Sequence, residues 1–214
     1  LEVYRSEQTS ISAEITLHTG EVVTKTFEGE GPFYISLTEF KDADDNPYVP
    51  KLWSPEEPYL YTMRIAAGED EVETYFALRT IEIKDINGVP RVCLNDKPIF
   101  MHGVLDQGYY SDGIFLPAEE EEYERDILRM KELGFNMLRK HIKIEPECFY
   151  YYCDRHGMLV MQDMVNNGEY SFIRDTALPT IGFKRKSDKT AGTSEREKIF
   201  IAHTEGTIKQ LYNH

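Results

Sequence analysis

The feature that most constrains the fold of this chain is the alternation of short apolar runs with helical segments after residue 100. Gly134 and Gly157 stand where two of the helices would end, as is common for helix C-termini. Ser194-Glu195-Arg196-Glu197 has the form of a capping box, which opens a helix. The expected strands are residues 100–105, 135–138 and 158–161, and the expected helices are residues 119–133, 146–156 and 194 onward.

This order of elements predicts a parallel sheet, because consecutive β-α-β units are right-handed and return to the same sheet. Residues 158–161 are apolar at every position, which is typical of a parallel strand covered on both sides. A doubly wound sheet and a barrel both satisfy the pattern. No Gly-x-Gly-x-x-Gly follows the first strand, which argues against a dinucleotide-binding fold. Residues 166–189 are polar and are expected to form a long loop.

The first part of the chain has a different pattern, with the two-residue period of half-buried strands. Ile11, Ala13, Ile15 and Leu17 alternate with polar residues. Further strand-like runs cover residues 22–27, 34–37, 59–65 and 72–79. Short strands at this spacing favour an immunoglobulin-like β-sandwich. The pattern changes near residue 84, so we expect domains at 1–84 and 85–214, with hairpin turns at Asn87-Gly88 and Asn95-Asp96.

The charge and cysteine content narrow the classes of partner. The net charge is -14, which argues against a nucleic acid and against an anionic membrane surface. No apolar run is long enough to cross a bilayer. The three cysteines, Cys93, Cys148 and Cys153, form no Cys-x-x-Cys motif and fit both the cytoplasm and the periplasm. Both ends of the sequence fall within expected secondary structure, so we expect a segment of a longer protein.

Polar side chains follow each expected parallel strand, at the edge of the sheet where parallel folds bind ligands. Carboxylates and amides hydrogen-bond hydroxyl groups, an aromatic ring can stack on a sugar, and an arginine can orient a carboxylate. These residue types favour a carbohydrate ligand. The predicted substrate-binding residues are Asp106, Gln107, Tyr109, Asp112, Arg139, His141, Asp163 and Asn166.

Each of these residues also has a structural interpretation. Arg139 could simply pair with Asp163 or Asp106, and His141 could be a structural hydrogen-bonding histidine. A metal site is conceivable from His102, Asp106, His141 and Asp163, but no His-x-His or His-Glu-x-x-His spacing supports it. We therefore expect no metal and no cofactor.

Several motifs, in the same order, resemble the family 2 glycoside hydrolases, which include β-galactosidases, β-glucuronidases and β-mannosidases. Trp53-Ser54-Pro55 is similar to a segment of their sandwich domain, and Phe76-Ala77-Leu78-Arg79 to one of its strands. Leu94-Asn95-Asp96-Lys97-Pro98 is similar to a turn of the family. The later matches are Gly103, residues 126–131, residues 136–139 and residues 153–160.

The resemblance implies an immunoglobulin-like sandwich followed by the first three units of a (β/α)8 barrel, in a retaining exo-β-glycosidase of β-galactosidase type. Such an enzyme uses two carboxyl groups. The family's two glutamates would follow His214, so this chain alone is expected to be inactive. Arg139 matches the family arginine after the second barrel strand, and Asp163 an acidic position after the third. Lys140-His141-Ile142-Lys143 stands where the family has Ser-His-Tyr-Pro.

Two alternatives to the glycosidase stay open at this stage. The first is a non-catalytic carbohydrate-binding or scaffold protein, and the second is a barrel hydrolase that uses a metal. The implied partner is a β-linked carbohydrate, and the sequence leaves homo-oligomerisation open.

Overall fold

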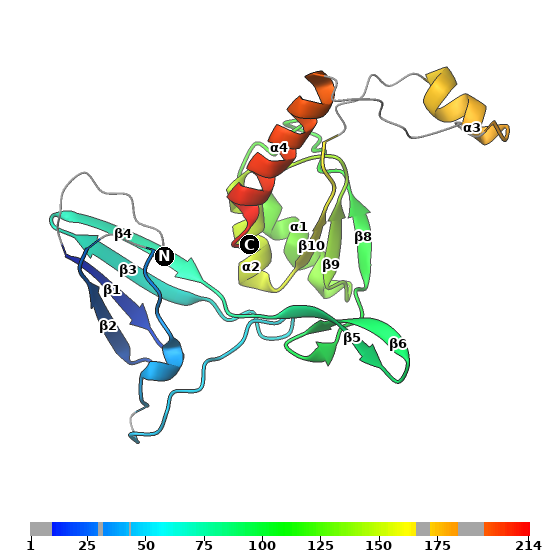
Figure 1. Cartoon of the computed structure of the whole chain (residues 1–214). Coiled ribbons are helices and arrows are strands. Elements are labelled where there is room, and N and C mark those ends of the chain that lie inside the picture. Colours follow the sequence, from blue (N-terminus) through cyan, green and yellow to red (C-terminus); the bar gives the residue numbers. More distant parts are fainter. Residues whose placement is uncertain (1–9, 30–31, 43, 166–171, 184–194) are drawn as a thin grey trace.

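The structure, a computed structural model, describes residues 10–29, 32–42, 44–165, 172–183 and 195–214. Figure 1 shows three sheets that follow one another along the chain, with the longer helices beside the third. Two of these sheets are antiparallel and the third is parallel, so the predicted change of pattern along the chain is confirmed.

The first sheet is antiparallel, with the strand order β2-β1-β3-β4. Its central strand β1 buries Ile11, Ala13 and Ile15 on one face, as their alternation predicts. Of the predicted sandwich, the described residues show this single four-stranded layer, and the second layer stays a prediction. The strands are β1 (Ile11–Thr16), β2 (Val22–Phe27), β3 (Tyr61–Ala67) and β4 (Asp70–Phe76).

The strand predicted at residues 34–37 is wrong, because this stretch leads into the 3-10 helix η1 (Leu37–Glu39). Tyr34 is 81% exposed, whereas Leu37 is buried beside Tyr48 and Tyr61. Ile35 packs against the same cluster, so the segment lies on the core without any pairing to a neighbouring strand. The alternation of its residues therefore reflects inward-facing side chains of an extended segment that pairs with no strand.

The second sheet is a hairpin with a short third strand, formed by β5 (Ile81–Ile86), β6 (Val89–Leu94) and β7 (Lys97–Pro98). Asn87 and Gly88 have φ of 56° and 80°, and Asn95 and Asp96 have φ of 49° and 67°. Two consecutive left-handed residues are the conformation that a tight hairpin turn requires. Both predicted turns are confirmed.

The third sheet is parallel, with β9 between β8 and β10. It consists of β8 (Gly103–Asp106), β9 (Met137–Lys140) and β10 (Leu159–Gln162), joined by α1 (Glu121–Glu132) and α2 (Glu147–His156). The first strand begins three residues later than predicted, and Phe100 is 80% exposed. The β8 backbone lies so close to β9 that a Cβ on Gly103 would collide with the Met137 carbonyl oxygen.

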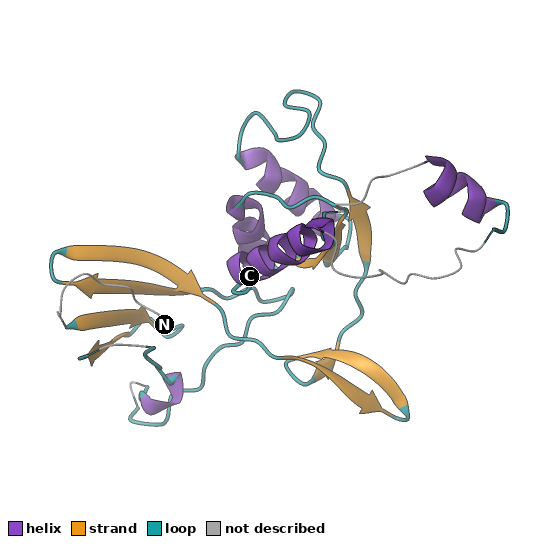
Figure 2. Ribbon diagram, turned by 45° about the horizontal axis from the view of Figure 1, so that its top comes forward, coloured by secondary structure: helices purple, strands orange, loops and turns teal. Residues whose placement is uncertain are grey.

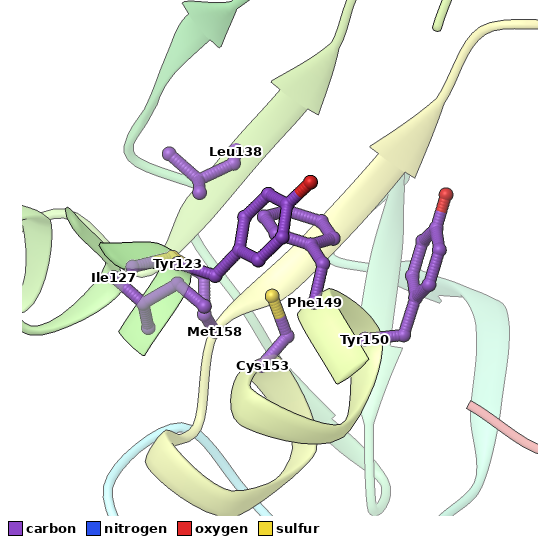
Figure 3. Packing of buried hydrophobic residues seen from close by; sticks show 7 residues of the cluster. All are labelled: Tyr123, Ile127, Leu138, Phe149, Tyr150, Cys153 and Met158. Atoms are coloured by element: carbon purple, nitrogen blue, oxygen red, sulfur yellow. The ribbon is translucent and has the colours of Figure 1, made fainter. Parts of the chain in front are cut away.

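The main core lies between the parallel sheet and its two helices (Figure 3). The apolar stripe of α1, with Tyr123 and Ile127, and that of α2, with Phe149 and Cys153, meet over Leu138 of β9. Both helices therefore cover the same face of this sheet. That arrangement suits a barrel and one half of a doubly wound sheet equally well, so the barrel stays a prediction.

The C-terminal part of the chain is more helical than predicted (Figure 2). The long loop expected at residues 166–189 contains a six-residue π-helix, η2 (Phe172–Ala177), and the short α3 (Leu178–Thr180). The expected last helix is confirmed as α4 (Glu195–Leu211), although the capping serine Ser194 lies outside the described residues. Within the described part of the chain, the helices are too short or too polar to cross a membrane.

The segment around Trp53 joins the first sheet to the helices of the third. The indole Nε1 of Trp53 donates to the Asp154 carbonyl oxygen at 2.7 Å. Lys131 Nζ donates to the carbonyl oxygens of Pro55 at 2.7 Å and Gly157 at 3.0 Å. Residues before position 84 thus pack directly on α1 and α2, and the predicted division at 84 stays a prediction.

Buried tyrosines make the stability of the protein sensitive to alkali. Burial raises the pKa of Tyr61, Tyr123 and Tyr150 above the usual 10.0. The folded state therefore favours the neutral phenol, and this contribution to stability is complete below the unfolded pKa and is lost as the pH rises through the folded pKa. We expect the urea midpoint to fall steadily as the pH is raised above about 10, the unfolded pKa. An unchanged midpoint across that range would contradict the burial of these phenols.

Candidate active site

The two faces of the parallel sheet carry different side chains. Val104, Leu138 and Val160 pack on the helical core. Because side chains alternate along a strand, the residues two positions later also face the helices. These are Asp106, Lys140 and Gln162, which stand side by side at the carboxyl ends of the strands. The opposite side, here called the open face, carries Leu105, Arg139 and Met161.

Arg139 and Asp163 form a bidentate ion pair at the carboxyl edge of the open face. Arg139 Nε donates to Asp163 Oδ1 at 3.1 Å, and Nη2 donates to Oδ2 at 2.9 Å. The hydrogen bonds to Asp163 raise the pKa of the guanidinium. Half of the arginine side chain is still exposed. The pairing predicted as the structural interpretation is present, and it leaves the guanidinium accessible to a ligand.

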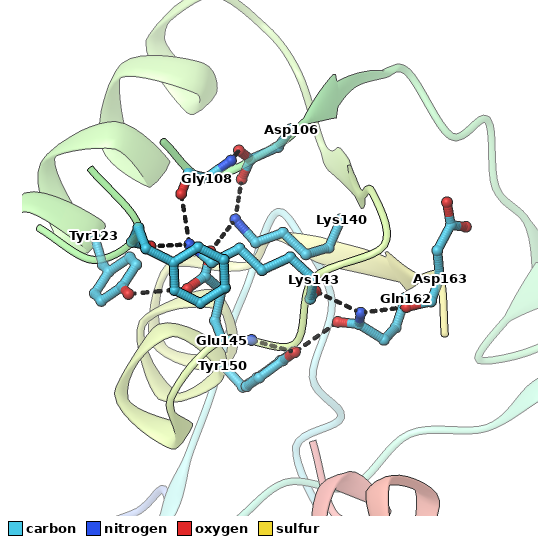
Figure 4. Close-up of polar contacts among 10 residues, drawn as sticks. Asp106, Gly108, Tyr123, Lys140, Lys143, Glu145, Tyr150, Gln162 and Asp163 are labelled. Atoms are coloured by element: carbon cyan, nitrogen blue, oxygen red, sulfur yellow. Dashed lines mark hydrogen bonds and ion pairs between the residues drawn. The ribbon is translucent and has the colours of Figure 1, made fainter. Parts of the chain in front are cut away.

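A buried network of charges lies behind this pair, on the helix side of the sheet (Figure 4). Lys140 is fully buried, and its Nζ lies 2.8 Å from Asp106 Oδ2 and 2.7 Å from Glu145 Oε1. Lys143 Nζ lies 2.8 Å from the same Glu145 oxygen. The hydroxyl of Tyr123 donates to Glu145 Oε2 at 2.9 Å. Two ammonium groups face two carboxylates, so the charges balance, as burial requires.

The network continues through neutral groups to the open face. The Tyr150 hydroxyl donates to Gln162 Oε1 at 2.6 Å. Gln162 Nε2 donates to the carbonyl oxygens of Lys143 at 2.8 Å and Asp163 at 2.7 Å. The backbone that carries Asp163 is thus tied to the backbone that carries Lys143. This link restrains the carboxylate that orients Arg139.

The remaining predicted residues are distributed around this edge. Asp106 faces the buried network instead of the open face, and it also accepts from the Gly108 amide at 2.8 Å. Gln107 and Tyr109 lie exposed in the loop after β8. Asp112 lies in the same loop and accepts from the Gly113 amide at 2.8 Å. His141 is partly buried, its amide donates to the Asp106 carbonyl oxygen at 2.8 Å, and Asn166 is outside the described residues.

The conceivable metal set does not converge. Asp106 and His141 lie at the carboxyl edge of the sheet. His102 lies before β8, where its amide donates to Asn136 Oδ1 at 2.8 Å. His102 and Asp106 are four positions apart, which is about 13 Å along a strand. The histidine at one end therefore cannot share an ion with the residues at the other.

Lys140, Lys143 and Glu145 were not among the predicted substrate-binding residues. One sequence signal could have identified Lys140: it follows Leu138 by two positions, so a strand that buries the leucine also turns the lysine toward the helices. A charge in that position must find a partner. Glu145 offered no such signal, because its approach to both lysines depends on the path of the chain between β9 and α2.

Comparisons with known proteins agree with this architecture. The family described as "Glycosyl hydrolases family 2" matches residues 1–79. A β-galactosidase of Pectobacterium atrosepticum is 36% identical over 121 residues, which are 53% of this chain and 11% of that protein. The chain is a relative of the family 2 glycosyl hydrolases. A second β-galactosidase, from Leuconostoc mesenteroides, is 30% identical over 174 residues, 74% of this chain and 16% of that protein.

A solved structure extends the match to the whole chain. The β-glucuronidase from Ruminococcus gnavus in complex with D-glucuronic acid superposes with a TM-score of 0.68. The match covers 100% of this chain and 32% of that protein, at 19% identity. At that identity the likeness concerns the fold alone. The chain spans about a tenth to a sixth of the length of the curated family 2 relatives it matches.

Proposed function

We propose that the protein to which this sequence belongs is a retaining β-glycosidase of β-galactosidase type. The observation that carries the proposal is the exposed Arg139, held by Asp163 at the carboxyl edge of a parallel sheet. The named β-galactosidases and the β-glucuronidase among the relatives support it. The proposal includes an immunoglobulin-like sandwich that precedes the barrel, in which β8, β9 and β10 are the first three strands.

The chemistry of such an enzyme divides between two carboxyl groups and the groups that hold the sugar. We place both catalytic carboxyl groups outside this chain. Arginine has five N–H donors, and Asp163 accepts from two of them, so three remain. These donors can bind sugar hydroxyl groups, while the Asp163 oxygens can accept from others. The pair therefore positions the sugar in preference to transferring protons.

A panel of chromogenic β-galactosides, β-glucuronides and β-mannosides tests the proposal on the protein that extends this sequence through the complete barrel. We expect turnover of one member, with the β-galactoside as first choice. If the folded protein hydrolyses no substrate of the panel, a carbohydrate-binding or scaffold protein is favoured. In that case sugar binding by calorimetry would persist without hydrolysis.

Arg139→Ala should weaken catalysis without unfolding the protein, because the side chain is half exposed. The loss of charged hydrogen bonds to the sugar should lower kcat/KM by about ten- to a hundredfold. The matched control is Arg129→Ala, which removes an exposed arginine that pairs with Asp126 on the surface of α1. If both variants retain the parent's kcat/KM, Arg139 does not contact the substrate.

A further inference from the structure

The loop that joins β8 to α1 carries exposed aromatic residues at the carboxyl edge of the sheet. Tyr109 is 65% exposed, and its ring lies 6.3 Å from that of Phe115 in an edge-to-face arrangement. The loop folds back on itself through two backbone hydrogen bonds between Tyr110 and Ile114, of 3.0 and 2.9 Å. Tyr110 turns inward, edge-on to Tyr123, so it packs as a wall residue and leaves Tyr109 as the accessible tyrosine.

Lys143 clamps the two ends of this loop. Its Nζ donates to the carbonyl oxygen of Gly108 at 2.5 Å and to that of Phe115. Its ion pair with Glu145 Oε1, at 2.8 Å, adds a third polar contact to these two hydrogen bonds. The side chain is 5% exposed, so water does not compete for these donors. The same Nζ lies 4.5 Å from the centre of the Phe115 ring and 5.9 Å from that of Tyr109, within the range of cation–π attraction.

Gly108 shows how closely the loop fits this clamp. Its φ is 63°, a conformation that favours glycine. A Cβ there would collide with Glu145 Oε1 and would lie 2.7 Å from Lys140 Nζ and 2.9 Å from Lys143 Nζ. Backbone and buried charges are therefore in direct contact. A displacement of the lysine would leave two carbonyl oxygens without their donor and would release the start and the end of the loop together.

We propose that Lys143 is a positioning residue that holds the 107–116 loop so that Tyr109 forms a stacking platform for the sugar. This inference rests on the proposed glycosidase function and names a specificity device for it. An exposed ring stacks on a pyranose only if its orientation is maintained. The clamp supplies that orientation from the buried network, since Lys143 itself has no access to the substrate.

The test uses the complete enzyme and a double-mutant cycle between Lys143→Met and Tyr109→Ala. Methionine keeps the length of the lysine side chain and removes its ammonium group. We expect each variant to raise KM for the chromogenic substrate by about tenfold with little change in kcat. The double variant should be no worse than either single one, because both changes remove the same contact.

Lys131→Met is the matched control, because Lys131 also donates to two backbone carbonyl oxygens, at the far end of α1. It should leave KM unchanged, whatever it does to stability. Hydrogen exchange separates positioning from stability: Lys143→Met should speed exchange of the Tyr110 and Ile114 amides selectively, and Lys131→Met should not.

Three outcomes would overturn the inference. They are additive effects in the cycle, a parental KM in the exposed variant Tyr109→Ala, and equal KM changes in Lys143→Met and Lys131→Met. A parental KM in the Tyr109 variant overturns the inference even if Lys143→Met fails to fold. If the unmodified enzyme turns over no substrate, the proposed function is overturned, and the stacking role with it. The hydrogen-exchange experiment still shows whether Lys143 holds the loop.

Discussion

Replacing Glu145 by alanine is expected to lower the free energy of unfolding by about 3–5 kcal/mol, the usual cost of removing one partner from a buried ion pair. Glu145 has no exposed side-chain surface and lies within 2.8 Å of both Lys140 Nζ and Lys143 Nζ. Its loss would leave two ammonium groups close together, with only Asp106 to balance them. Urea denaturation followed by circular dichroism measures the change.

The control for this prediction is Glu71→Ala, which also removes a carboxylate from a cation. Glu71 pairs with Arg64 on the exposed face of the first sheet, where solvent screens the charges and such pairs contribute little. We expect its urea midpoint to stay close to that of the parent. A Glu145→Ala protein as stable as this control would show that the lysines find other partners or lose their charge.

Trp53→Ala should be comparably destabilising, at about 3–5 kcal/mol, because a large buried aromatic side chain leaves a cavity. Trp53 is 3% exposed and donates from Nε1 to the Asp154 carbonyl oxygen. The Arg79 guanidinium also lies 5.6 Å from its ring. Because Trp53 is the single tryptophan of the chain, circular dichroism must replace fluorescence as the measurement.

Trp53→Phe separates the two contributions of this residue. Phenylalanine fills much of the volume but removes the N–H donor, so the expected loss is about 1 kcal/mol, the usual net value of one hydrogen bond. Tyr34→Ala, an exposed aromatic truncation, should change little. If Trp53→Ala lowered stability no more than Tyr34→Ala, the packing between the first sheet and α2 would be wrong.

Local signals in the sequence were sufficient for most of the secondary structure. The period-two pattern located β1 and β2, and the Asn87-Gly88 and Asn95-Asp96 pairs located both hairpin turns. These features depend on neighbouring residues alone, through backbone conformation and alternation. The failure at residues 34–37 has the same origin, since side chains there alternate between core and solvent although the segment pairs with no strand.

The same local signals predicted only part of the candidate site. Arg139 and Asp163 were both predicted at the carboxyl ends of the strands, and they lie together there. Asp106 was predicted at the same site, but it lies on the other face of the sheet. A shift of one residue along a strand reverses the direction of a side chain, and strand limits read from sequence are uncertain by more than that.

The sequence by itself thus determined the order of strands and helices, the hairpin turns and the parallel sheet, because each follows from local periodicity or from the handedness of β-α-β units. Only the tertiary structure decided which charges are buried and with whom. Gly108 is far in sequence from Lys143 and Glu145. The three residues meet because the loops after β8 and β9 pack against each other. Buried charges are stable only where their partners also arrive, so their pairing is a property of the folded chain.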